Sequence, residues 1–121
     1  MVVLLSATAC GGDSRGSPTT LRYGGLYQGL CESRAEATDP DAARRTFFDH
    51  VHRPLHELAS EAAAADRGAA SRLLEAKEAV ERGLAGEPAT LAADLDRLLD
   101  ATGGAIRATG GPTPKPCKER L

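Results

Sequence analysis

The clearest helical pattern of the sequence lies in residues 38–65, which read TDPDAARRTFFDHVHRPLHELASEAAAA. Asp39 supplies a capping side chain, and Pro40 suits the first turn of a helix. Asp41 then places a carboxylate near the positive end of the helix dipole. Apolar side chains recur at helical spacing along one face: Phe47, Phe48, Val51, Leu55, Leu58 and Ala62. The stretch therefore predicts an amphipathic helix that buries this face.

Three further stretches repeat apolar residues at helical spacing. They run from Pro18 to about Ala37, between Gly68 and Gly86, and from Pro88 to Thr109. On the third predicted helix the inward face is Ala70, Leu73, Leu74, Lys77, Val80 and Leu84. Amphipathic helices joined by short links become antiparallel neighbours. The sequence thus predicts an all-α fold, an antiparallel up-down-up-down four-helix bundle over residues 18–109.

Length, composition and charge restrict the possible functions. A chain of 121 residues with 41% hydrophobic residues, many of them alanine, is enough for one domain. The net charge of −2 is spread along the chain and leaves no basic stripe, so we expect no nucleic-acid partner. No Gly-x-Ser-x-Gly elbow and no glycine-rich loop after a strand occurs in the sequence. We therefore expect a protein that is not an enzyme.

The N-terminal residues carry the most specific motif. Residues 2–5 are apolar, residues 6–9 are small, and Cys10 follows, leading into GGDS. This pattern resembles the end of a bacterial lipoprotein signal peptide, in which a cysteine after small residues receives a diacylglyceryl group. Alanine stands at position 7, where that family usually has leucine, and no basic residue precedes the apolar run. The alternative is an unprocessed cytosolic terminus with an incidental cysteine.

The resemblance covers residues 1–14 and implies a location. Residues 1–9 would be part of a longer signal peptide, Cys10 the lipidation site, and residues 10–17 a flexible tether. The protein would then sit on the extracytoplasmic face of the cell membrane, held by lipid alone. The helical part is similar to small lipoproteins of high-GC Gram-positive bacteria, a likeness that gives no residue a role.

The two remaining cysteines favour an oxidising compartment. With Cys10 lipidated, Cys31 and Cys117 are left as a pair. We expect them to form a disulfide that ties the Pro/Gly-rich tail, residues 110–121, to the first helix. Closing so long a loop stabilises a domain by about 4–5 kcal/mol in the chain-entropy model. The alternative is a pair of unrelated thiols.

All three histidines of the chain lie in the second predicted helix, between acidic and basic residues. Helical spacing places Asp49, His52 and His56 in one stripe, whereas His50 points elsewhere. Two imidazoles and a carboxylate at this spacing form a half-site for Cu, Zn or Fe. A carboxylate from a neighbouring helix can complete it: Glu32 or Glu36 from the first predicted helix, or Glu75 or Glu78 from the third.

Two other interpretations of the histidine stripe stay open. The imidazoles can cover the edge of the core and hydrogen-bond to neighbouring carboxylates, or they can act as a proton-linked switch. Pro54 cannot donate to the carbonyl of His50, so it predicts a kink at the stripe. Tyr23 and Tyr27, four residues apart, favour packing at the core edge over a sugar-binding platform.

These patterns lead to two hypotheses of function. The first is a surface-tethered, non-enzymatic binding module of the cell envelope, with a Cu, Zn or Fe ion as the most concrete ligand. The second is a structural or interaction lipoprotein that presents a helix face to an envelope protein partner. Metal binding by the isolated protein separates the two.

Overall fold

The computed structural model describes the backbone from Pro18 to Lys118 and the side chains from Tyr23 to Lys118. The elements in this range are α2 (Pro18–Ala35), α3 (Pro40–Thr46), the π-helical turn η1 (Phe47–Val51), α4 (His52–Ala65), α5 (Arg67–Ala85), the 3-10 turn η2 (Pro88–Thr90) and α6 (Leu91–Ala108). The predicted signal peptide and Cys10 lie outside the described residues, so they stay predictions.

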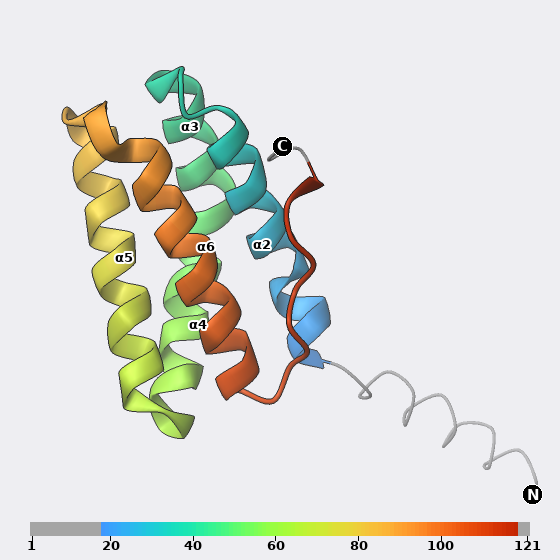
Figure 1. Cartoon of the computed structure of the whole chain (residues 1–121). Helices are drawn as coiled ribbons and strands as arrows, with labels where there is room; N and C mark the ends of the chain where they lie inside the picture. The colour runs from blue at the N-terminus through green and yellow to red at the C-terminus, as the bar shows by residue number, and fades with distance from the viewer. Residues whose placement is uncertain (1–17, 119–121) are drawn as a thin grey trace, which may run out of the picture.

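The helices form a four-helix bundle, as the sequence predicts. α3, η1 and α4 follow one another without a gap, and together they make the second helix of the bundle. α5 packs against α4 and α6, and α6 packs against α2 (Figure 1). Short links between successive helices reverse the chain at each end, which gives the up-down-up-down order.

Aspartate caps begin two of the helices, one at Asp39, as the sequence predicts, and one at Asp66. Asp39 Oδ1 accepts a hydrogen bond of 3.3 Å from the backbone N–H of Ala42, at the start of α3. Asp66 Oδ1 accepts one of 3.1 Å from the N–H of Ala69, at the start of α5. Each cap satisfies a donor that the first helical turn leaves without an intrahelical acceptor. The Asp66 cap therefore explains why a single residue separates α4 from α5.

The core is built mainly from leucine and alanine. Its largest fully buried side chains are Tyr23, Phe47, Leu26, Leu30, Leu55, Leu58, Leu73, Leu91, Leu95, Leu98, Leu99 and Val51. Two residues predicted on inward faces are exposed instead: Phe48 is 48% exposed and Leu74 is 37% exposed. Phe48 lies in the π-helical turn, whose extra residue rotates it off the face. At Leu74 the preceding Leu73 occupies the core position.

The π-helical turn lies just before Pro54, where the sequence predicts a kink. Proline has no N–H, so the carbonyl of His50 loses its α-helical donor. The N–H of His52 bonds to the carbonyl of Phe47, five residues back. α2 approaches this turn closely, because a Cβ at Gly29 would lie 3.2 Å from both His50 Cβ and Val51 Cγ2. Glycine at this position permits the contact.

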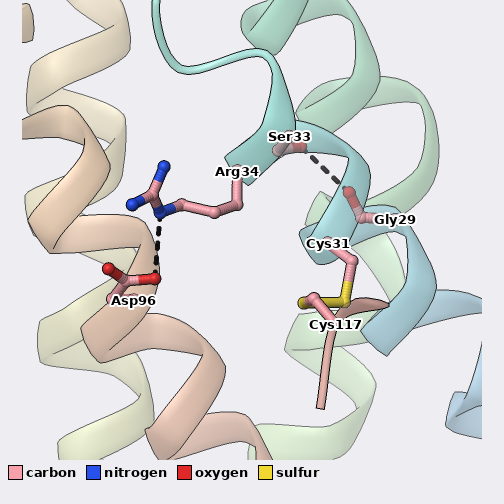
Figure 2. Close-up of a disulfide and its surroundings, with 6 residues drawn as sticks. All are labelled: Gly29, Cys31, Ser33, Arg34, Asp96 and Cys117. Atoms are coloured by element: carbon pink, nitrogen blue, oxygen red, sulfur yellow. Dashed lines mark hydrogen bonds and ion pairs between the residues drawn. A yellow bond between two sulfur atoms is a disulfide. The ribbon is translucent and has the colours of Figure 1, made fainter. Parts of the chain in front are cut away.

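The C-terminal tail turns back along the bundle. Gly110 has φ +94°, a conformation that favours glycine, and the N–H of Gly111 bonds to the carbonyl of Ile106 at 3.0 Å. Residues 112–118, drawn in dark red in Figure 1, then run beside α2. The predicted disulfide between Cys31 and Cys117 is confirmed, with an S–S distance of 2.03 Å (Figure 2).

Candidate functional site

A groove of about 1020 Å³ lies between α2 and the tail. We call it the α2–tail groove, and residues 112–118 are the strap. It is lined by Tyr23, Gly24, Tyr27, Gln28, Cys31, Glu32, Arg34, Ala35, Ile106, Pro112, Thr113, Pro114, Lys115, Pro116, Cys117 and Lys118. Its size is near the upper end of small-molecule sites, which usually range over about 300–1000 Å³.

The walls of the groove are largely apolar, and a disulfide joins them. Tyr23 is buried, and Tyr27 is half-buried one helical turn further along α2. Ile106, buried on α6, contributes apolar surface between the two walls. The disulfide joins the walls covalently (Figure 2). The resulting site is therefore concave and rich in aromatic and proline side chains, as binding sites for organic ligands commonly are.

Besides the disulfide, the strap makes few contacts with the bundle. Arg107 Nη1 donates to Thr113 Oγ1 at 3.5 Å, and both side chains are exposed. Pro114 approaches α6 where a Cβ on Gly103 would lie 3.8 Å from its Cδ. No backbone–backbone hydrogen bond ties residues 112–118 to the helices described. The disulfide is thus the main link that keeps the outer wall of the groove in place.

The polar groups of the groove lie at its rim. Arg34 Nε donates to Asp96 Oδ1 at 2.9 Å, so the Arg34 guanidinium is engaged with α6 (Figure 2). Among the residues that the structure describes, no carboxylate forms an ion pair with Lys115 or Lys118. Glu32 is the acidic residue of the lining, and it is exposed. The strap therefore presents two cations without a counter-ion in this range.

The predicted histidine stripe does not line the α2–tail groove; it lies on η1 and α4. The ring centroids of His52 and His56 are 4.8 Å apart, and the ring of Phe48 lies 5.3 Å from His52. His52 Nδ1 is 3.1 Å from Glu81 Oε2 on α5, and Lys77 Nζ donates to Glu81 at 3.1 Å. The stripe therefore faces a carboxylate that is already shared with a cation.

The third predicted ligand does not join the two rings. Asp49 is exposed on η1, and no group of three or more His, Cys, Asp or Glu side chains in residues 23–118 is placed to hold a metal ion. Burial, followed by the charges of Lys77 and His52, lowers the pKa of His56 from 6.5. The neutral imidazole is the form that binds metals, so the direction of this shift favours the metal-binding form of His56.

The carboxylate that contacts His52 is not one of the four predicted from the sequence as possible ligands. Glu36 accepts a hydrogen bond of 2.7 Å from Thr46 Oγ1, and Glu32 lines the α2–tail groove. Glu81 is the carboxylate beside His52, one turn after Glu78. The spacing of Lys77 and Glu81, four apart, is a signal for their ion pair. That spacing does not show which α4 residue lies opposite, because the helix register is set by packing.

Comparisons with protein families, with curated proteins and with solved structures find no match to this chain. Among the helices that the structure describes, none is long and apolar enough to cross a bilayer.

Proposed function

We propose that this protein is a lipid-tethered, non-enzymatic binding module of the extracytoplasmic face of the cell membrane, and that its ligand site is the α2–tail groove. The observation that supports this proposal is a concave, apolar groove whose outer wall is tied by a disulfide. A disulfide suits an oxidising compartment outside the cytosol. A large apolar pocket with a few polar groups is the usual form of a binding site for an organic ligand.

Two neighbouring glycines give a direct test of the groove. Gly24 lines it, Gly25 does not, and a Cβ at either position meets no atom within 4 Å. Gly24→Phe should therefore place a ring in the groove and weaken binding of the neutral apolar dye N-phenyl-1-naphthylamine by about tenfold, a loss of about 1.4 kcal/mol. Dye fluorescence on titration of the folded protein measures this.

The matched control is Gly25→Phe, which adds the same ring to the same helix. Both substitutions replace glycine in a helix, so both should stabilise α2 by a few tenths of a kcal/mol. Gly25→Phe should bind the dye as the parent protein does. Equal affinity of the two variants for the dye would show that the dye does not use the α2–tail groove, and would reject it as the ligand site.

Lipid anchoring is tested separately. Cys10→Ser removes the thiol that would carry the diacylglyceryl group, so the variant should move from the membrane to the soluble fraction. The fold should be unchanged, because Cys10 lies before the first helix described and outside the disulfide. Fractionation of the producing cells with immunoblotting measures this. Equal membrane retention of the variant and the parent would remove the anchor from the proposal.

Binding of Cu(II) or Zn(II) by the histidine stripe is a second candidate function. It is favoured by the 4.8 Å spacing of the His52 and His56 rings and by the lowered pKa of His56. At a concentration about a hundredfold over its Kd, a bound metal stabilises the fold by about 2.7 kcal/mol. We expect His52→Ala and His56→Ala each to abolish the rise in melting temperature. Calorimetric scans with and without metal measure it.

His50→Ala is the control for the metal experiment, because His50 is exposed and does not share the ring contact. It should leave the rise in melting temperature intact. A loss as large as that of His56→Ala would make the stripe structural. If neither the metal nor the dye binds, the alternative hypothesis takes their place: a lipoprotein that presents a helix face to an envelope protein partner.

A further inference from the structure

We propose that the α2–tail groove selects amphipathic anions: ligands with a long hydrocarbon chain and a single carboxylate or phosphate head group. This inference rests on the proposed function of the groove and adds the chemical class of the ligand. Two features of the groove carry it: an apolar interior and a cationic strap.

The interior of the groove suits a hydrocarbon chain. The half-buried ring of Tyr27 and the prolines of the strap provide its accessible apolar surface, and the buried side chains of Tyr23 and Ile106 lie behind it. Each methylene group that is removed from water adds to the affinity, because burial of hydrocarbon is favourable. A volume of about 1020 Å³ leaves room for a chain of many methylene groups.

The rim of the groove favours a negative head group. Lys115 and Lys118 stand on the strap, are exposed, and form no ion pair with a described carboxylate. Arg34 is already bonded to Asp96 across to α6, so the two lysines are the cations left for a ligand. A carboxylate or phosphate can accept charge-assisted hydrogen bonds from them. A cationic head group would have one carboxylate to pair with, that of Glu32, and both lysines would repel it.

The groove also carries its own optical reporter. The chain contains two tyrosines and no tryptophan, and both tyrosines line the groove. Tyrosine fluorescence of the protein therefore reports on this site. A ligand that enters the groove should change the surroundings of Tyr27, the more exposed of the two rings.

The first experiment is a titration of the oxidised full chain carrying Cys10→Ser. This variant cannot be lipidated at Cys10, so it can be handled without detergent. Dodecanoate, below its micelle concentration, should change the tyrosine fluorescence with saturation. Dodecyltrimethylammonium, which has the same chain and the opposite charge, should bind at least about tenfold more weakly. Acetate, which has the head group alone, should have no effect. Equal binding of the two dodecyl probes would overturn the anion selectivity, and an equal response to acetate would identify a site for small free anions instead.

The second experiment removes the cationic rim. Lys115→Glu with Lys118→Glu should weaken dodecanoate binding by about tenfold or more at low salt, and the difference should shrink as salt screens the rim. The matched control is Arg53→Glu with Arg72→Glu, which changes the net charge equally at exposed positions outside the groove. Equal weakening in both double variants would mean that net charge, rather than the strap, governs binding, and would overturn the proposal.

Binding of the neutral dye separates this inference from the function on which it rests. The strap variant should keep its affinity for N-phenyl-1-naphthylamine, since that dye carries no charge. Dye binding that is sensitive to Gly24→Phe, without preference for dodecanoate, would leave the groove a binding site and reject its anion selectivity. Loss of both would reject the groove itself.

Discussion

Reduction of the Cys31–Cys117 disulfide is expected to lower the free energy of unfolding by about 4–5 kcal/mol. The bridge spans 86 residues of sequence, so it removes much of the conformational freedom of the unfolded chain. Small domains have a total stability of about 5–15 kcal/mol, so the loss is a large share of it. Urea denaturation of the oxidised and reduced protein, followed by circular dichroism, measures the difference.

Loss of the Cys31–Cys117 disulfide should also release the strap and so remove the outer wall of the α2–tail groove. The strap is held by the disulfide, by a long hydrogen bond from Arg107 and by packing against α6. Cys31→Ala with Cys117→Ala should therefore lose binding of the neutral dye even in conditions where the helices remain folded. Cys10→Ser is the control and should leave stability and dye binding unchanged. A urea midpoint that is insensitive to reduction would contradict this account of the bridge.

Glu81→Ala is expected to destabilise the protein by about 2–3 kcal/mol. Its carboxylate contacts both Lys77 and His52, and the side chain of Lys77 is only 9% exposed. Removing one partner of a fully buried ion pair costs about 3–5 kcal/mol, because the other charge stays buried without compensation. Glu81 is itself 26% exposed, so water reaches the pair and the cost is smaller. Chemical denaturation measures the loss.

Two further variants test the physical reason for this effect. Glu78→Ala, on the same helix at an exposed position, should change stability by less than about 0.5 kcal/mol. Lys77→Met replaces the buried cation by an apolar chain of similar length, which is often nearly neutral. In that background Glu81→Ala should cost far less than it does alone. An equal cost in both backgrounds would show that Glu81 acts through something other than Lys77.

Helical spacing predicted one part of the histidine stripe correctly and another part wrongly. The spacing of His52 and His56 brings their rings together, as predicted. Asp49 does not complete the stripe, because Pro54 removes a backbone donor and the chain forms a π-helical turn over Phe47–Val51. A period of about 3.6 residues no longer holds across such a turn. Residues before and after it therefore change their relative direction.

The features that could be predicted from the sequence are local or covalent in origin. The capping side chain of Asp39, first-turn prolines and apolar periodicity marked the helices and hence the bundle, because these signals act within a few residues. Parity of the cysteines indicated the bridge between Cys31 and Cys117. The contact between Glu81 and His52, and the groove between α2 and the tail, became visible in the folded structure alone. Both depend on contacts between residues distant in sequence, which periodicity along a single helix does not contain.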